Sequence, residues 1–170
     1  MNLHTKNFLL RSTAKEMQQK KGQKGFSLIE LLIVVAIIGI IAAIAIPNLL
    51  ASRRAANEAS AVSALRTIGT AQSTYSSTVG GGSYGTMDNL KTQALIDSAI
   101  ADATAAAPKS GYFYGISGAG ASGFKSGAAR ATTNTGSRNF TSDEAGVIYA
   151  FTGAAATLAY ETSAGAPIGN

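Results

Sequence analysis

The sequence predicts an α+β protein in which one long N-terminal helix packs against a small antiparallel sheet. Three observations carry this prediction. Residues 26–46 are almost wholly apolar, and as a helix they would span about 30 Å, the thickness of the hydrocarbon core of a bilayer. Apolar residues then recur three and four apart as far as Tyr75, the spacing of an amphipathic helix. After Pro108, aromatic and β-branched runs are separated by Gly and Ser, which is typical of short strands joined by turns.

The apolar run contains a single charged residue, Glu30. A buried helix of a soluble domain seldom stays apolar on every face over such a length, so we interpret the run as a membrane span. Gly39 and Pro47 weaken the helix. Because proline removes a backbone donor, we expect a kink near residues 43–46. The alternative is a membrane helix that simply tolerates both residues.

Residues 1–24 are polar and basic, and they precede the apolar run. A secretory signal peptide would instead be cut behind its apolar core. By the positive-inside rule the basic side is cytoplasmic, and the rest of the chain lies beyond the inner membrane. The sequence leaves open whether the chain starts at Met1 or at Met17.

The net charge of +5 comes from residues 1–25, because the remainder has eight basic and eight acidic residues. We therefore expect no intrinsic nucleic-acid-binding face. The chain has no cysteine, and its one histidine, His4, lies in the basic segment. Beyond that segment, thiol catalysis, Ser-His-Asp catalysis and Cys- or His-ligated metals are thereby excluded. We expect no cofactor, no metal and no enzymatic activity.

The second part of the long helix carries one apolar stripe, which we expect to pack on the sheet. The stripe is formed by Val62, Leu65, Ile68, Ala71 or Gln72, and Tyr75. On another face, Arg54 and Glu58 stand four apart and could form an exposed pair worth about a few tenths of a kcal/mol. Three consecutive glycines at 80–82 end the helix.

A shorter second helix is predicted over residues 88–107, and Pro108 closes it. The expected strands lie at residues 112–116, 137–141, 147–151 and 157–161, with a turn at 143–146. Lone hairpins are marginal in water, so these strands need the apolar stripe of the helix to pack on. Without a disulfide, packing and strand pairing alone must hold this half together.

Residues 118–123 match the pattern G-x-G-x-x-G. Dinucleotide binding requires a helix directly after the third glycine, whereas residues 125–137 are rich in Gly, Ser, Thr and Asn, so we interpret the motif as a flexible surface loop.

Asp143 and Glu144 could offer oxygens to calcium, but two adjacent carboxylates are far fewer than the six to eight oxygen ligands that calcium takes. The sequon at Asn139 lies in a predicted strand and is discounted.

The segment Gly25-Phe26-Ser27-Leu28-Ile29-Glu30, placed between basic residues and an apolar run, resembles the processing site of type IV pilins and of the related type II secretion pseudopilins. The resemblance implies that a prepilin peptidase cuts after Gly25 and that Phe26 is then N-methylated. It also implies that Glu30 pairs with the α-amine of Phe26 on a neighbouring subunit, and that the segment from Gly39 to Pro47 partly melts on assembly. Alternatively, Glu30 only reaches back to the cytoplasmic headgroups.

The implied organisation is a cleaved leader at 1–25, a transmembrane and assembly segment at 26–52, and a globular head at 53–170. The implied function is that of a structural subunit of a type IV pilus-like filament. The alternative is a major-type pseudopilin of a type II secretion system. An enzyme anchored by an uncleaved signal is a third possibility, which the missing histidine and cysteine disfavour. Many relatives close their C-terminal region with a disulfide, and this chain departs from that pattern.

The resemblance implies several partners: further copies of the chain, the inner membrane before assembly, the peptidase and methyltransferase, an assembly platform and minor pilins. The precursor would cross the inner membrane once with a cytoplasmic N-terminus, and the assembled subunit would be extracellular. The sequence leaves open whether the filament serves twitching, adhesion, DNA uptake or electron transfer.

Overall fold

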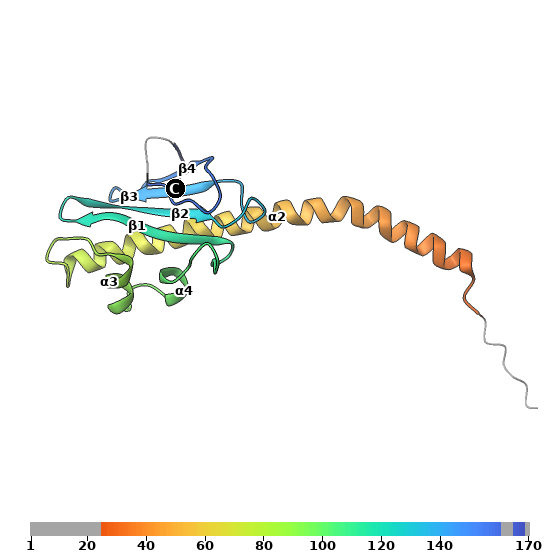
Figure 1. Cartoon of the computed structure of the whole chain (residues 1–170), viewed down its shortest axis with the longest axis horizontal. Helices are drawn as coiled ribbons and strands as arrows, with labels where there is room; N and C mark the ends of the chain where they lie inside the picture. The colour runs from red at the N-terminus through yellow and green to blue at the C-terminus, as the bar shows by residue number, and fades with distance from the viewer. Residues whose placement is uncertain (1–24, 161–164, 169–170) are drawn as a thin grey trace, which may run out of the picture. The chain divides into compact units, whose positions relative to one another are not determined.

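The computed structural model describes residues 25–160 and 165–168 (Figure 1). Its contacts divide the chain into two units, Met1–Ala43 and Ile44–Asn170, and each is described by itself. Helix α2 (Leu28–Ser77) begins in the first unit and ends in the second. It is helical throughout, Gly39 and Pro47 included. The kink near residues 43–46 and the melting of this segment stay predictions.

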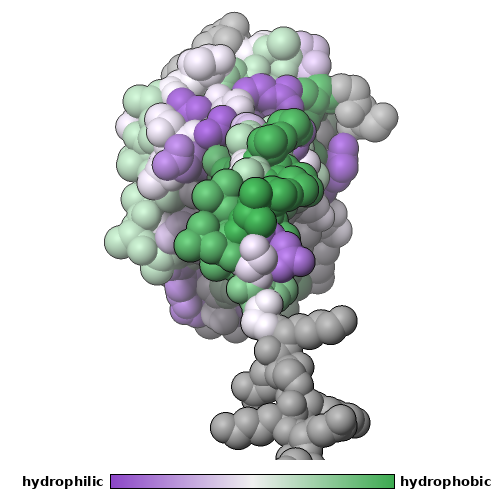
Figure 2. Space-filling view, turned by 90° about the vertical axis from the view of Figure 1, so that its right-hand side faces the viewer, coloured by the Kyte–Doolittle hydropathy of each residue, from purple (hydrophilic) through white to green (hydrophobic). Residues whose placement is uncertain are grey.

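The apolar part of α2 leaves its side chains exposed. Within the described residues, α2 is a helix long and apolar enough to cross a membrane, and none of its most apolar window is buried. Figure 2 shows apolar side chains gathered into one patch on the face turned toward the viewer. The exposed large hydrophobic residues up to residue 50 are Phe26, Leu28, Ile29, Leu31, Leu32, Ile33, Val34, Val35, Ile37, Ile38, Ile40, Ile41, Ile44, Ile46, Leu49 and Leu50.

The second unit contains a five-stranded sheet of order β1-β2-β3-β4-β5, in which each strand is antiparallel to the next (Figure 1). The strands are β1 (Tyr112–Gly120), β2 (Gly123–Arg130), β3 (Asn139–Asp143), β4 (Ile148–Phe151) and β5 (Ala166–Pro167). A helix packed on an antiparallel meander confirms the predicted α+β class. The predicted turn at residues 143–146 is also present, closed by a hydrogen bond from the Gly146 N–H to the Asp143 carbonyl at 3.0 Å.

One face of the sheet packs on α2. Tyr114, Ala128, Phe140 and Ala150 lie opposite one another along the four long strands and therefore share this face. All four are buried in one core cluster with residues of α2. Burial of this apolar surface is the main term that stabilises the second unit.

Strand β2 is absent from the sequence prediction, which interpreted residues 118–123 as a flexible surface loop and expected no helix or strand over the residues that follow as far as 136. The motif G-x-G-x-x-G is instead the hairpin between β1 and β2, in which Gly120 pairs with Gly123 and Gly118 has a φ of +64°. The residues of β2 are mostly small and have weak intrinsic strand preference. Hydrogen bonds to β1 on one side and to β3 on the other hold these residues in an extended conformation. Intrinsic strand preference does not include this effect of the tertiary structure.

The prediction of a single helix over residues 88–107 is also wrong. Two short helices occur there, α3 (Met87–Thr92) and α4 (Ser98–Ala101). Asp97 accepts a hydrogen bond from the Ala99 N–H at 3.0 Å and so starts α4 as a new helix. Between the two helices Ala94 has a φ of 54°, which no continuous helix permits.

The strand expected over residues 157–161 is not formed by its described part, residues 157–160. This segment lies instead across the face of the sheet that points away from α2. Gly115 and Gly127 are opposite one another on β1 and β2, and Leu158 and Tyr160 pack over both. A Cβ atom at Gly115 would lie 2.5 Å from the Tyr160 hydroxyl oxygen, so the glycine makes the space that the segment fills.

Candidate functional site

The N-terminus of α2 is organised by Glu30. Leu28 is the first helical residue, and the Glu30 carboxylate accepts a hydrogen bond from the Ser27 N–H at 2.9 Å. The Leu31 N–H donates to the Ser27 carbonyl at 3.2 Å. This is the acidic half of a capping box, in which a carboxylate three residues into the helix satisfies the N–H of the residue before it. A negative charge in the first turn also complements the helix dipole.

The bond between Gly25 and Phe26 lies just outside the helix. Both residues are exposed, Phe26 to 76%. A Cβ atom at Gly25 would meet no heavy atom within 4 Å, and its φ is not in the left-handed region. Nothing in the described chain therefore requires a glycine at this position. A requirement for glycine would have to come from a molecule that handles this bond.

Glu30 and Phe26, which we expected to meet between neighbouring subunits, are placed here within one uncleaved chain. In that chain the nitrogen of Phe26 is part of a peptide bond and carries no charge. Glu30 is then engaged by the Ser27 N–H. Pairing of Glu30 with a free α-amine stays a prediction for the processed protein. Gly39 and Pro47 both lie inside α2, and a Cβ atom at Gly39 would meet nothing within 4 Å.

The stripe residues of α2 divide by depth. Leu65 and Ile68 are fully buried in the core cluster, while Val62 and Tyr75 are half-buried against it. Gln72 is fully buried, and its side-chain amide donates to the Gly85 carbonyl at 2.6 Å and accepts from the Gly85 N–H at 2.8 Å. Burial of this amide leaves no polar atom unsatisfied, because its nitrogen and its oxygen are both hydrogen-bonded.

Glu58 is the site residue that sequence reasoning missed. It is 91% buried, since its exposed fraction is 9%. Its carboxylate accepts from the N–H of Ser137 at 2.8 Å and of Arg138 at 3.2 Å, and from the Arg138 guanidinium at 2.9 and 3.1 Å. The expected pair of Glu58 with Arg54 is not formed. Arg138 takes the place of Arg54 because the loop before β3 brings its backbone donors and its guanidinium to the same carboxylate.

The ionisation of Glu58 reflects the same contacts. Burial is the largest single influence and raises the pKa of its carboxyl. The hydrogen bonds from Ser137 and Arg138, together with the charge of Arg138, outweigh burial, so the pKa lies below its ordinary value. Glu58 is therefore a charged link between α2 and the sheet.

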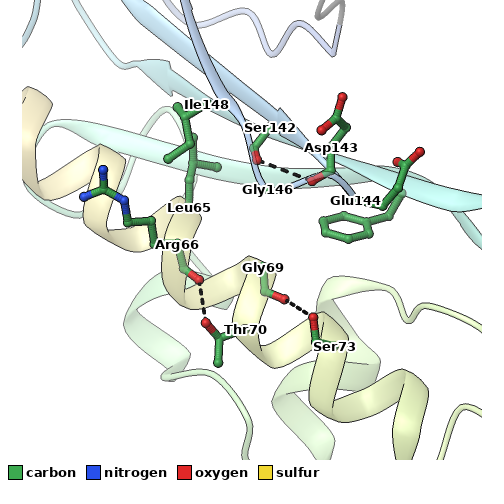
Figure 3. A pocket seen from close by; sticks show the side chains of 11 residues that line it. Leu65, Arg66, Gly69, Thr70, Ser73, Ser142, Asp143, Glu144, Gly146 and Ile148 are labelled. Atoms are coloured by element: carbon green, nitrogen blue, oxygen red, sulfur yellow. Dashed lines mark hydrogen bonds between the residues drawn. The ribbon is translucent and has the colours of Figure 1, made fainter. Parts of the chain in front are cut away.

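A hollow of about 390 Å³ lies between α2 and the turn from β3 to β4 (Figure 3). Thr70 and Ser73 line it, but their hydroxyls donate to the carbonyls of Arg66 and Gly69 on the same helix, at 3.1 and 3.2 Å. The turn contributes Asp143 and Glu144. Across residues 25–160 and 165–168, no group of three or more His, Cys, Asp or Glu side chains could hold a metal ion.

The comparisons with known proteins match short stretches of the chain, and the family match lies in its N-terminal part. Residues 20–46 match the family described as the prokaryotic N-terminal methylation motif. The chain is 66% identical over 38 residues to the type IV wide pilus major component PilA4 of Thermus thermophilus, which covers 22% of this chain and 29% of that protein. It is 50% identical over 52 residues to the type IV major pilin protein PilA of Myxococcus xanthus, which covers 31% and 24%.

A relative from a secretion system matches over a stretch of similar length. The chain is 42% identical over 45 residues to the type II secretion system core protein G of Aeromonas hydrophila, which covers 26% of this chain and 32% of that protein. The matches thus span only about a quarter to a third of the length of these relatives. The N-terminal segment thus carries the methylation motif, and over short stretches the chain is similar to type IV pilins and to a type II secretion core protein.

Proposed function

We propose that this chain is a structural subunit of a type IV pilus-like filament, cut after Gly25, N-methylated at Phe26 and polymerised from the inner membrane. One observation carries the proposal. An exposed Gly25–Phe26 bond directly precedes a helix whose large apolar side chains are exposed as far as Leu50 and whose first turn holds one carboxylate, Glu30. A processing site, an apolar assembly surface and an ionic partner for a new N-terminus are thus adjacent.

Processing fits the local structure. A protease needs its substrate bond in accessible backbone outside regular structure, and residues 25–27 are non-helical and exposed ahead of the helix. The open surroundings of Gly25 indicate that the glycine is there for another molecule, since the chain itself would accept a side chain. This supports recognition by a peptidase that reads the glycine.

Assembly fits the apolar surface. Monomeric soluble proteins rarely expose large contiguous apolar patches, so the apolar part of α2 needs a cover. We propose that the bilayer covers it first and that copies of the same helix cover it in the filament. In the filament, the Glu30 carboxylate would accept the α-amine of Phe26 from a neighbour, which neutralises two charges in an apolar core.

The remaining partners and the location follow from this pathway. The precursor would be a single-pass inner-membrane protein with a cytoplasmic N-terminus, and the processed subunit would meet an assembly platform and minor pilins. We propose no catalytic role. A major-type pseudopilin is the second candidate, favoured by the similarity to a type II secretion core protein. The pilus is preferred because the identity to pilus components is higher, at 66% and 50% against 42%.

The proposal is tested on filaments sheared from cells that express the chain. Mass spectrometry of their main subunit should find an N-terminus at N-methylated Phe26. A subunit that still begins at Met1 or Met17, or one cut after Ala45, would overturn the processing step. Gly25→Val should leave uncut precursor in the membrane, whereas Gly39→Ala, a change at another open glycine, should be cut normally. Processed subunit that is found only in short, secretion-dependent filaments would favour the pseudopilin.

A further inference from the structure

We propose that Arg53 and Arg54 bind anionic phospholipid headgroups in the outer leaflet of the inner membrane while the subunit awaits assembly. This inference rests on the proposed function, because it needs the apolar part of α2 to span the bilayer. The two arginines are the only charged residues between Glu30 and Glu58. They form an isolated pair of positive charges in an otherwise uncharged stretch of helix.

The position of the two arginines along α2 determines how deep their side chains lie in the bilayer. Arg53 follows Ile46, the last residue of the apolar run, by seven residues, which is about 10 Å of helix. The polar zone of a bilayer extends about 5–8 Å beyond the hydrocarbon core on each side. An arginine side chain reaches back along its own helix while its guanidinium stays among polar groups. With residues 26–46 in the hydrocarbon core, both guanidinium groups thus reach the phosphate layer.

The sheet leaves this part of the helix uncovered. The first hydrogen bonds between α2 and the loop before β3 are made at Asn57, whose side-chain amide donates to the Thr135 carbonyl at 2.9 Å, and at Glu58. Arg53 lies before that point and is exposed, and Arg54 is half-buried. A lipid headgroup therefore has free access to Arg53 and to the outer side of Arg54.

Neither arginine is paired within the described part of the chain. The salt bridges found there join Lys91 to Asp102 and Arg138 to Glu58. Arg54 has a shielded Nε without a hydrogen-bond partner. The nearest acid along the helix, Glu58, is fully engaged by Arg138 and Ser137. An external anion is the partner that this arrangement lacks, and a guanidinium binds a phosphate through two parallel hydrogen bonds.

The test uses the whole chain in vesicles. The chain has no tryptophan, so Ile46→Trp introduces a single fluorophore at the end of the apolar run. Vesicles mix phosphatidylcholine and phosphatidylglycerol, with bromine on the acyl chains of one lipid at a time. Quenching by each brominated lipid reports its relative occupancy around the helix. Each arginine near an anionic surface favours association by roughly fivefold, so we expect phosphatidylglycerol to be enriched between about fivefold, if one arginine acts, and about 25-fold, if both do.

Further variants isolate the arginines. Arg53→Gln with Arg54→Gln should abolish the enrichment, and Arg53→Glu with Arg54→Glu should reverse it. The matched control, Arg66→Gln with Lys125→Gln, removes the same charge from the sheet-bearing part and should keep it. Because Arg53 is exposed, Arg53→Gln alone leaves folding intact and should remove about half of the effect. Inorganic phosphate at about 10 mM should not compete, since the neighbouring lipids hold phosphate at a far higher local concentration.

The failures are distinguishable. Equal quenching by both lipids in the Ile46→Trp protein would overturn the lipid contact and leave the membrane span intact. Enrichment that survives Arg53→Gln with Arg54→Gln would also overturn it. Displacement by inorganic phosphate would show an ordinary anion site in place of a lipid site. No quenching by either lipid would overturn the span itself, and with it the anchoring step of the proposed function.

Discussion

Arg138 holds Glu58 by two guanidinium nitrogens, Nε at 3.1 Å and Nη2 at 2.9 Å, across a separation of 80 residues in sequence. The contact joins the loop before β3 to α2, one residue beyond Asn57, whose side chain also donates to that loop. The Glu58 carboxylate also accepts hydrogen bonds from two backbone N–H groups of this loop. It therefore holds the loop backbone in place in addition to balancing the charge of Arg138.

Replacing Glu58 with Gln should destabilise the second unit. The amide oxygen can accept fewer of the four hydrogen bonds, and the Arg138 charge loses its partner. We expect a loss of about 1–3 kcal/mol in the free energy of unfolding, because hydrogen bonds to charged groups are worth that much and Arg138 is half exposed. Chemical unfolding followed by circular dichroism measures it. The control Lys91→Gln breaks an exposed pair and should cost less than about 1 kcal/mol. Equal losses in the two variants would contradict the role of Glu58.

Acid should weaken the same link. The pKa of Glu58 is lower in the folded chain than its ordinary value of 4.5. Its contribution to stability is therefore complete above about pH 4.5 and is lost as the pH falls from there through the folded pKa. The urea midpoint should decline over this window. In Glu58→Gln that part of the decline should be absent; an unchanged pH profile would show that other carboxylates control acid unfolding.

Leu65→Asp should unfold the sheet-bearing unit. Leu65 is 1% exposed within the core cluster, and an aspartate there would be a buried charge without a partner. The penalty competes with a total stability of only about 5–15 kcal/mol. Ser63→Asp, two residues away on the exposed face of α2, should fold normally. Cooperative thermal melting of a fragment from Ala55 onward, which we expect to be soluble, distinguishes the two; a normal melt for Leu65→Asp would mean that the buried face is misassigned.

Gly115→Ala should displace the segment that crosses the outer face of the sheet. The new methyl group would approach Leu158 and Tyr160 more closely than atoms allow, and such overpacking typically costs about 1–3 kcal/mol. Gly120→Ala, in the same strand but with no atom within 4 Å of its Cβ, is the control and should be nearly neutral. Thermal unfolding and the solvent accessibility of Tyr160 report the effect. Similar melting temperatures for the two variants would contradict the packing of Leu158 and Tyr160 over Gly115.

Glu30→Val should block assembly and spare processing. The substitution removes a charge from the apolar segment, so membrane insertion should be unharmed, and Gly25 is untouched. The Phe26 α-amine would then enter the filament core without a partner, and loss of one member of a buried pair typically costs about 3–5 kcal/mol. Electron microscopy should find no surface filaments, while mass spectrometry finds processed subunit in the membrane. Glu30→Asp should be intermediate. Abundant filaments of pure Glu30→Val would show that Glu30 only reaches the headgroups.

The sequence alone was enough for the features that are local or periodic. The apolar run, the spacing that continues the helix to Ser77, the end of the helix before the glycines and the turn at residues 143–146 each depend on residues close together in the chain. The α+β class followed from the same local patterns. The segment from Gly25 to Glu30 was recognisable because its residue types and their order are themselves the signal.

Only the tertiary structure decided the rest. Strand β2 is built from small residues that are extended because β1 and β3 bond to them on both sides. The partner of Glu58 lies 80 residues away, so the nearer Arg54 was the only candidate visible along the helix. Gly115 and Gly127 leave room for Tyr160 only because strand pairing places the two glycines side by side beneath it. In each case the deciding contact joins distant residues, and neither propensity nor periodicity carries information across that distance.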